Sequence, residues 1–528
     1  MKLIRGMLIC ALSLLPADLA AQVRATPPSK PKLVVLLAVD QFRYDYLTRF
    51  QGRYTSGLGR LLKAGAVFTQ AHLEHYPSVT AVGHATMLTG AYPAHSGIIG
   101  NDWYDRASGK SVTSVSDPSV SMLGGTEGAG ASPRRLLVTT IGDELKIATR
   151  GQSRVIGMSL KDRSAILMAG HSADGAYWYD SRTGNFVSST YYFSALPRWV
   201  SDYNESRPAD RFAGRPWASQ ESKPSDGPSE PFRVLPAQPG PQLYSAIGST
   251  PFGNDLLVDL AKRALAAEQL GTRGVTDLLA ISFSSNDSVG HDHGPDSPQV
   301  EDTCEQTDRQ IGELLQALDR HAGLAQVLLI LTADHGVAPV PEEMQKRKMP
   351  GGRISGKDLF GPIESALAAA YGPWRWILAT AGSSPYLNYD LIRERNLDPA
   401  QVRATAVATA MGAPRVAKAF TRDQLEKAQA GDDPLSRRVL RGFHSQRSGD
   451  LEILLEPYWI RSASGTTHGT PYSYDTHIPL VFMGPGIRPG RYHQPVALND
   501  LAPTLAALLG VETPSAAAGR VLEEMLAR

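Results

Sequence analysis

Three apolar runs of strand length, each followed by an aspartate, constrain the fold of this 528-residue chain more than any other feature. The runs KLVVLLAVD, DLLAISFSSND and QVLLILTAD end at Asp40, Asp287 and Asp334. Continuous apolar runs of this length are typical of strands buried on both faces, as in a parallel sheet. Because helical patterns lie between them, we predict a doubly wound, mostly parallel α/β sheet with helices on both faces. The clearest helical patterns cover residues 55–64, 80–89, 301–322 and 501–509.

Two stretches interrupt this alternation of strands and helices. Residues 202–250 are rich in Pro, Ser, Gly and charge, which predicts a long surface excursion. Residues 340–460 combine basic loops, helices at about 357–371 and 399–411, and a strand in DLEILLEPYWI. Apolar core strands recur after both stretches, so we interpret them as insertions into one domain that covers residues 22–528. Separately folded domains are the alternative.

The N-terminus has the pattern of a signal peptide. Lys2 and Arg5 precede an apolar segment at residues 6–15 and a small-residue region that ends near Ala21. We therefore predict a signal peptide over residues 1–21 and a periplasmic or secreted protein; an N-terminal strand or helix of the domain is the alternative. The apolar segment is too short to span a bilayer, so we expect no membrane anchor after signal removal.

Charge and cysteine content exclude several classes of protein. The 53 Lys and Arg residues balance 52 Asp and Glu residues, which gives no support for a nucleic-acid-binding surface. Two cysteines exclude a disulfide scaffold and a thiolate zinc site. Cys304, which lies in a helical pattern, is interpreted as a buried, unreactive thiol. No pattern predicts an oligomeric state or a further structural metal such as calcium.

The aspartates that follow the strands are candidate metal ligands. Strand ends of this kind form the ligand crevice of an open α/β sheet. A lone aspartate there often only caps a helix, but His291 follows Asp287 and His335 follows Asp334. Carboxylates together with imidazoles are a ligand set that suits Zn²⁺. The neighbouring glycines, Gly290 and Gly336, predict tight loops that turn the rings inward.

A candidate nucleophile lies in HYPSVTAVGHATMLTG, where Thr80 begins a short helix that ends at Gly90. A hydroxyl residue at a helix N-terminus is most often a cap, but the same position also favours a bound phosphate. A threonine hydroxyl becomes nucleophilic only when a base or a metal lowers its pKa. The aspartate–histidine pairs would supply such metals. His84, one turn later, is expected to pack against this helix.

These motifs, taken in order, resemble the alkaline phosphatase superfamily. Within it the chain is similar to the bacterial alkaline phosphatases of the PafA type, which use a threonine nucleophile. The motifs in question are Asp40 after its strand, PSVT with Thr80, Asp287 with His291, DHG at 334–336 and THG with His468. Further matching segments are GIIGN at 97–101, SLKDR at 159–163, RSGDLEILLEP at 447–457, HGTPYSYDTHIPLVFMGPGI at 468–487 and DLAPTLAALLG at 500–510.

The resemblance implies a set of metal and phosphate ligands. It implies that one zinc ion is bound by Asp287, His291 and His468. It implies that a second is bound by Asp40, Asp334 and His335, with Thr80 beside it as nucleophile. Asn101, Lys161 and Arg163 would bind the phosphoryl oxygens. The last two follow a strand-like run, RVIGMSL, which allows both charges to stand at the crevice edge. His477 is interpreted as a residue that supports the metal site or is structural. The other histidines are assigned no metal: His72, His75, His84, His95, His171 and His293.

The implied activity is hydrolysis of small-molecule phosphate monoesters at a two-zinc site, through a phosphothreonine intermediate, with release of inorganic phosphate. The alternative is a phosphodiesterase or nucleotide pyrophosphatase that uses the same threonine and metals. Lys161 and Arg163 favour monoesters, whose extra anionic oxygen benefits from cationic partners. Sulfatase chemistry needs a modified Cys or Ser, and position 80 holds neither. A protein that only binds metal or phosphate is a further alternative, which the completeness of the motif set disfavours.

Overall fold

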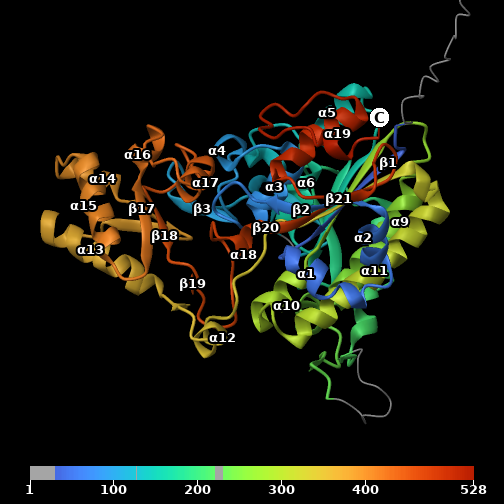
Figure 1. The fold of residues 1–528 in the computed structure, drawn as a ribbon, viewed down its shortest axis with the longest axis horizontal. Coiled ribbons are helices and arrows are strands. Elements are labelled where there is room, and N and C mark those ends of the chain that lie inside the picture. Colours follow the sequence, from blue (N-terminus) through green and yellow to red (C-terminus); the bar gives the residue numbers. More distant parts are fainter. Residues whose placement is uncertain (1–29, 127, 220–229, 528) are drawn as a thin grey trace, which may run out of the picture.

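A central sheet built on the expected apolar strands organises the molecule (Figure 1). The computed structural model describes residues 30–126, 128–219 and 230–527, so the predicted signal peptide lies outside the described residues. The main strands run in the order β2–β20–β13–β1–β12–β7–β8, with smaller strands at both edges. Their bounds are β2 Ala66–His72, β20 His477–Met483, β13 Val327–Thr332, β1 Leu33–Val39, β12 Asp277–Phe283, β7 Val155–Ser159 and β8 Gly175–Asp180.

The middle of the sheet is parallel, as predicted. Strand β1 pairs in parallel with β12 on one side and β13 on the other, and β7 and β8 continue the parallel order. Strand β20 pairs antiparallel with both β13 and β2. Every residue of β1, β12 and β13 is buried, which is why these strands are almost entirely apolar rather than alternating.

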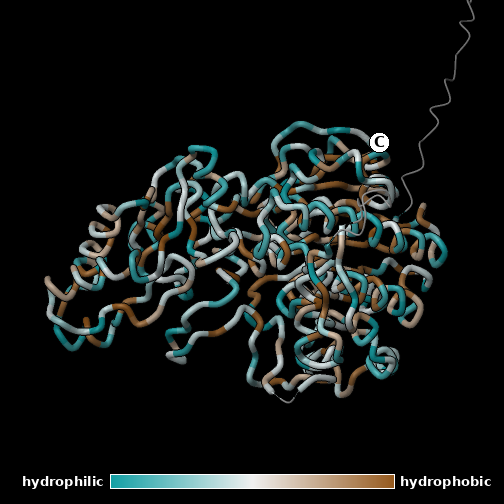
Figure 2. Tube along the Cα trace, turned by 90° about the horizontal axis from the view of Figure 1, so that it is seen from below, coloured by the Kyte–Doolittle hydropathy of each residue, from teal (hydrophilic) through white to brown (hydrophobic). Residues whose placement is uncertain are grey.

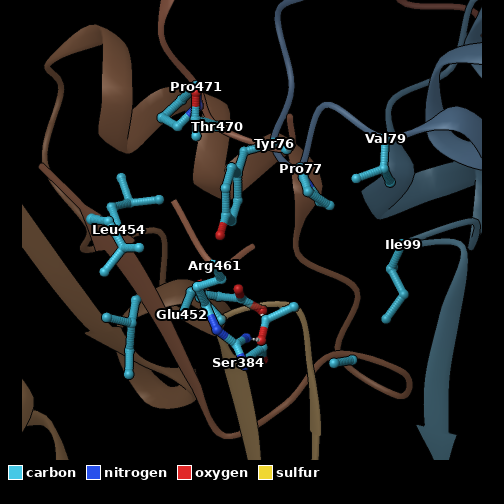
Figure 3. A pocket seen from close by; sticks show the side chains of 18 of the residues that line it. Tyr76, Pro77, Val79, Ile99, Ser384, Glu452, Leu454, Arg461, Thr470 and Pro471 are labelled. Carbon is cyan, nitrogen blue, oxygen red and sulfur yellow. Dashed lines mark hydrogen bonds between the residues drawn. The ribbon is translucent and has the colours of Figure 1, made fainter. Parts of the chain in front are cut away.

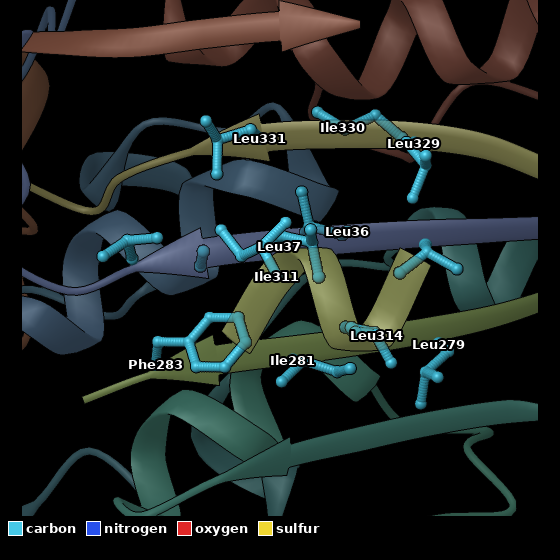
Figure 4. Close-up of a cluster of buried hydrophobic side chains, with 14 of the residues drawn as sticks. Leu36, Leu37, Leu279, Ile281, Phe283, Ile311, Leu314, Leu329, Ile330 and Leu331 are labelled. Atoms are coloured by element: carbon cyan, nitrogen blue, oxygen red, sulfur yellow. The ribbon is translucent and has the colours of Figure 1, made fainter. Parts of the chain in front are cut away.

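Helices cover both faces of this sheet. On one face α2 (Gly57–Ala64), α9 (Phe252–Ala267) and α11 (Pro298–Ala322) pack together, and Ile311 and Leu314 of α11 lie against the strands (Figure 4). On the other face lie α3 (Thr80–Thr89), α5 (Ile141–Ala148), α6 (Asp162–Ala169) and α19 (Leu501–Leu509) (Figure 1). The four helices predicted from sequence correspond to α2, α3, α11 and α19. In Figure 2 hydrophobic segments, coloured brown, run through the middle of the part that contains the main sheet.

Residues 341–460 form the lobe coloured yellow to orange in Figure 1. The expected helices are α13 (Gly356–Tyr371) and α15 (Pro399–Gly412), and the expected strand is β18 (Leu451–Leu455), which pairs with β17 (Val416–Thr421). This lobe has small two-stranded sheets and a buried apolar cluster of its own, separate from the cluster around the main sheet.

The stretch 202–250 is more firmly anchored than a surface excursion. Trp217 is buried, and its indole N–H donates to Asp302 on α11. In α8 (Pro241–Gly248), Leu243 and Ile247 join the main apolar cluster. The expectation of a surface excursion was therefore wrong for these parts, because a few large apolar side chains within polar sequence are enough to dock a segment. Among the described residues, no helix is long and apolar enough to cross a membrane.

Candidate active site

The candidate site lies where β1, β12 and β13 end at their carboxyl edge. Asp40 directly follows β1 and Asp334 lies two residues after β13, so the parallel register brings both carboxylates to one place. Both are fully buried. Asp40 Oδ1 and Asp334 Oδ2 have no hydrogen-bond partner among the described residues. Buried carboxylate oxygens without a partner are costly unless a cation binds them, so these oxygens fit metal ligands.

Asp287 and His291 sit on a helix rather than at a strand end. Strand β12 ends at Phe283, and both residues belong to α10 (Ser285–His293). Their four-residue spacing places them on one helix face, with His291 Nε2 3.2 Å from Asp287 Oδ1. The prediction of a tight loop at Gly290 was therefore wrong. This glycine is instead required by close packing, since a Cβ would lie 1.8 Å from Gln41 Oε1.

The glycine after His335 also marks a close approach rather than a tight turn. Gly336 has no positive φ, and a Cβ there would lie 2.3 Å from the carbonyl oxygen of Tyr474. The amide N–H of Gly336 donates to the Asp475 carbonyl. Packing against this segment, rather than a left-handed turn, therefore explains the glycine.

Three histidines converge on the carboxylates with the same orientation. In each, Nδ1 engages a backbone carbonyl: Thr466 for His291, Gly336 for His335 and Ser78 for His468, at 2.8–2.9 Å. This leaves Nε2 facing the acids, and His335 Nε2 lies 3.3 Å from Asp334 Oδ2. A ring held by one nitrogen with the other turned to carboxylates is the usual arrangement of metal-binding histidine.

The described residues contain two groups whose ligand atoms lie within 4.8 Å of one another. One group is Asp40, Asp334 and His335, as the resemblance implies. The other joins Asp287 and His468 with His335, whose ring stacks on that of His468 at 3.5 Å between centroids. His291 lies outside this tight group but beside Asp287. The two groups thus share the His335 imidazole and lie next to each other.

The electrostatics of the site suit cation binding. Burial, together with Asp287 and Asp334, raises the pKa of Asp40 to about 7. Burial lowers the pKa of His335 to about 4 and that of His468 well below its ordinary value, so both rings are neutral ligands at neutral pH. Burial opposes a charge on His291, but Asp287 outweighs it and raises the pKa of His291 to about 9. A metal at this position would therefore displace a proton.

Lys161 places a positive charge between two of the buried carboxylates. Its Nζ lies 2.6 Å from both Asp40 Oδ2 and Asp287 Oδ2. Despite burial, Lys161 holds the pKa of Asp287 well below its usual range. Arg163 stands two residues on, in the first turn of α6, and its buried Nε has no partner among the described residues. Lys161 thus lies at the crevice edge, as the strand-like run predicted, and the same placement of Arg163 stays a prediction.

Thr80 begins helix α3 at the same crevice. Its Oγ1 lies 3.4 Å from His335 Nε2, and the residue before it, Val79, has no side chain that can cap the helix. Asn101 Oδ1 accepts the Ala81 backbone N–H at 2.8 Å, so the Asn101 side chain lies at the start of the same helix. The structure therefore brings together Thr80, Asn101, Lys161 and all six expected metal ligands.

Sequence reasoning missed Gln41, which connects both acidic groups. Its backbone N–H donates to Asp334 Oδ1 at 3.1 Å, and its Nε2 donates to Asp287 Oδ1 at 2.6 Å. The backbone at Gln41 has a φ of 63°, a region that non-glycine residues rarely adopt. Its place next to Asp40 was the only signal in the sequence.

His84, His477 and Cys304 lie where the sequence interpretation placed them. His84 Nδ1 lies 2.8 Å from the Thr80 carbonyl on its own helix, and its Nε2 lies 2.8 Å from Ser282 Oγ. His477 is the first residue of β20, where its ring stacks between Tyr44 and His72, apart from both acidic groups. Cys304 is buried, and burial raises the pKa of its thiol well above the usual value.

Comparison with known proteins identifies the family of this chain. Residues 34–477 match the model of the type I phosphodiesterase / nucleotide pyrophosphatase family. The chain belongs to this family. It is 36% identical to alkaline phosphatase PafA of Elizabethkingia meningoseptica, over 96% of both chains. It is 37% identical to alkaline phosphatase PhoV of Synechococcus elongatus, over 94% of this chain and 93% of that protein. A Myroides odoratus protein named a calcium-transporting ATPase is 38% identical, over 94% and 95%.

A solved structure of a relative has the same fold. The crystal structure of wild-type PafA aligns with a TM-score of 0.88 at 36% identity, covering 95% of this chain and all of the other. The mixed α/β architecture, with its mostly parallel central sheet between helices, is therefore that of the alkaline phosphatase relatives.

Proposed function

We propose that this protein is an alkaline phosphatase, which hydrolyses small phosphate monoesters and releases inorganic phosphate through a phosphothreonine intermediate. The observation that carries the proposal is the convergence of buried carboxylates and three oriented imidazoles beside the Thr80 hydroxyl. The whole-length similarity to PafA and PhoV supports the same activity. Residues 1–21 further support export, so we propose a periplasmic or secreted enzyme.

Two zinc ions are the proposed cofactors. Asp287, His291 and His468 would hold one, and Asp40, Asp334 and His335 the other. Carboxylates with imidazoles fit zinc, and Asp40 Oδ1 and Asp334 Oδ2, buried oxygens that accept no hydrogen bond among the described residues, support cations there. Bound zinc would supply positive charge that polarises phosphoryl oxygens and lowers the pKa of a nearby hydroxyl.

The residues of the chain carry the two displacement steps. The Thr80 oxygen attacks phosphorus as the bond to the leaving oxygen breaks, and the hydroxyl proton passes to solvent. Water then attacks the phosphothreonine, the Oγ–P bond breaks, and the threonine hydroxyl is restored. Asn101 and Lys161 donate hydrogen bonds to phosphoryl oxygens throughout, so positioning and charge lower the barrier.

The two cations favour monoesters over diesters. A monoester carries about two negative charges near neutral pH, whereas a diester carries one and has a second organic substituent. Lys161 Nζ lies between Asp40 and Asp287, and the Nε of Arg163 has no hydrogen-bond partner among the described residues. An extra anionic oxygen would engage both groups. The family model, named for phosphodiesterases, supports diester hydrolysis at the same threonine and metals as the second candidate.

Paired turnover tests this proposal. Zinc-loaded protein without residues 1–21 is assayed on p-nitrophenyl phosphate and bis-p-nitrophenyl phosphate, as kcat/KM. We expect a strong monoester preference that collapses in Lys161→Ala and Arg163→Ala. A diester preference would instead support the second candidate.

The nucleophile needs its own test. Thr80→Ala should abolish most turnover while zinc stays bound, whereas the matched Thr80→Ser variant keeps a hydroxyl and should retain activity. Acid quenching of the wild type during turnover, followed by mass spectrometry, should locate a phosphate on Thr80. Near-wild-type rates in Thr80→Ala, or a phosphate on another residue, would refute the assignment.

A further inference from the structure

A cavity of about 380 Å³ adjoins the candidate active site (Figure 3). Val79, Asn101 and His468 form part of its wall, so it opens beside the residues proposed to bind phosphate. The opposite wall comes from the lobe of residues 341–460, through β16 (Ser384–Leu387), β18 and β19 (Trp459–Ile460). A small-molecule site is typically a cavity of this size, mostly apolar with a few polar groups.

Much of the cavity wall is apolar. Tyr76, Pro77, Val79, Ile99 and Leu454 line it. In Figure 3 the Tyr76 ring extends along the cavity, and its hydroxyl points toward Glu452, Arg461 and Ser384. An aromatic or aliphatic body therefore fits between the phosphate site and a polar end.

An acid and a base form that polar end without pairing with each other. Glu452 accepts the Ser384 hydroxyl at 3.0 Å, and burial raises the pKa of Glu452 to about 7. Arg461 also lines the cavity; its Nη1 donates to the Gly382 carbonyl, and its Nη2 makes no hydrogen bond among the described residues. No ion pair between Glu452 and Arg461 occurs among the described residues. Each keeps unused hydrogen-bonding capacity toward the cavity.

We propose that this cavity binds the leaving group of the phosphate ester, and that Glu452 and Arg461 select leaving groups with an ammonium and a carboxylate behind an apolar body. O-phosphotyrosine has this chemistry. Its ring would lie along the apolar walls, its ammonium would donate to Glu452, and its carboxylate would accept from Arg461. The inference rests on the proposed phosphatase function and adds a substrate class to it.

Four substrates with a phenolic leaving group test the selection. Phenyl phosphate has neither polar group, tyramine phosphate has only the ammonium, O-phosphotyrosine has both, and N-acetyl-O-phosphotyrosine amide has both blocked. Their leaving phenols have similar pKa values, near 10, so intrinsic reactivity changes little. We expect kcat/KM to be about tenfold or more higher for O-phosphotyrosine than for phenyl phosphate, because a polar site rejects analogues that leave it unpaired. The blocked amide, which mimics a phosphotyrosyl peptide, should lose this advantage.

Two variants assign the polar groups. Glu452→Gln should lower the ratio of kcat/KM for tyramine phosphate over phenyl phosphate about tenfold. Arg461→Gln should lower the ratio for O-phosphotyrosine over tyramine phosphate by a similar factor. Glu456→Gln is the matched control, because Glu456 lies one residue beyond the end of β18 but outside the cavity lining, near Arg415. It should leave both ratios unchanged.

The outcomes separate this inference from the proposed function. If phenyl phosphate is not hydrolysed at all, the phosphatase assignment fails. If phenyl phosphate is hydrolysed but the four substrates have equal kcat/KM, or Glu452→Gln leaves the tyramine ratio unchanged, the selection by this cavity is overturned. Equal rates for the free and blocked phosphotyrosine would overturn it as well. Thermal melting of each variant identifies any that do not fold, and the substrate series with wild-type protein stands without them.

Discussion

Gln41 offers a direct test of how the acidic groups are held in place. Its two hydrogen bonds join Asp334 and Asp287, which belong to different elements and follow it by 293 and 246 residues. The residue is buried and adopts a left-handed backbone with a φ of 63°. Such a conformation is retained only where the surroundings favour it. We predict that the side chain positions Asp287 and that the backbone strain is the cost of placing it there.

The magnitudes follow from two substitutions at the same position. Both Gln41→Ala and Gln41→Gly remove the Nε2 bond to Asp287, a bond to a charged group that contributes about 1.5–3 kcal/mol. Alanine keeps the left-handed strain, which costs about 1–2 kcal/mol, whereas glycine relieves it. We therefore expect Gln41→Ala to lose about 1.5–3 kcal/mol of unfolding free energy, and Gln41→Gly to be about 1 kcal/mol more stable than Gln41→Ala.

Denaturant unfolding and steady-state kinetics measure the two effects separately. Both variants should lose about 10-fold to 100-fold in kcat/KM on p-nitrophenyl phosphate or in zinc affinity, as expected when a group that orients a metal ligand is removed. The activity loss should be similar in the two variants while their stabilities differ. Wild-type activity and zinc affinity in both variants would refute the positioning role. A glycine variant no more stable than the alanine variant would refute the strain.

Three further predictions concern metal removal, pH and packing. Lys161→Ala should lower the melting temperature more in chelator-treated protein than in zinc-loaded protein, because Lys161 is the cation that offsets Asp40 and Asp287 when zinc is absent; equal shifts would contradict this. The raised pKa of Glu452, about 7 against an ordinary 4.5, means that the folded state binds more protons than the unfolded state between these values. The stability of wild type relative to Glu452→Gln should therefore fall as pH rises from about 4.5 to 7 and stay constant above, and a flat difference in denaturant melts would refute the burial argument. Gly83→Ala should reduce kcat/KM, since its Cβ would lie 2.3 Å from the Asp334 carbonyl oxygen and push α3 away, whereas unchanged kinetics would show that the helix adjusts freely.

Much of the fold was readable from local pattern. The runs that became β1, β12 and β13 are apolar at all positions but Asp277, Ser282 and Thr332 because both faces are covered, and that property needs no knowledge of partners. Helix α3 was predicted from Thr80 to residue 89, with its C-terminal Gly90 in the left-handed conformation that ends helices. Aspartates at the ends of apolar runs, with histidines close behind two of them, marked candidate ligands, and the family resemblance added His468 and the two ligand sets.

The errors arose where short-range pattern is ambiguous. Asp287 and Asp334 both come shortly after an apolar run, four residues after β12 and two residues after β13, yet the first lies on a helix and the second does not. A glycine between or after them fits a turn and a close contact equally well. Only packing decides, and at Gly290 the deciding contact is with Gln41.

The sequence by itself therefore determined the class of fold, the chemical types in the site and their order along the chain. It did so because burial and ligand chemistry depend on each residue's own properties. The tertiary structure alone decided that Gln41 joins two acids, that Lys161 lies between Asp40 and Asp287, and that Glu452 faces a cavity near His468. The first two contacts join residues more than a hundred positions apart, and the strand register brings these residues together. The third joins the lobe of residues 341–460 to the main part of the molecule, and the packing of the lobe creates it.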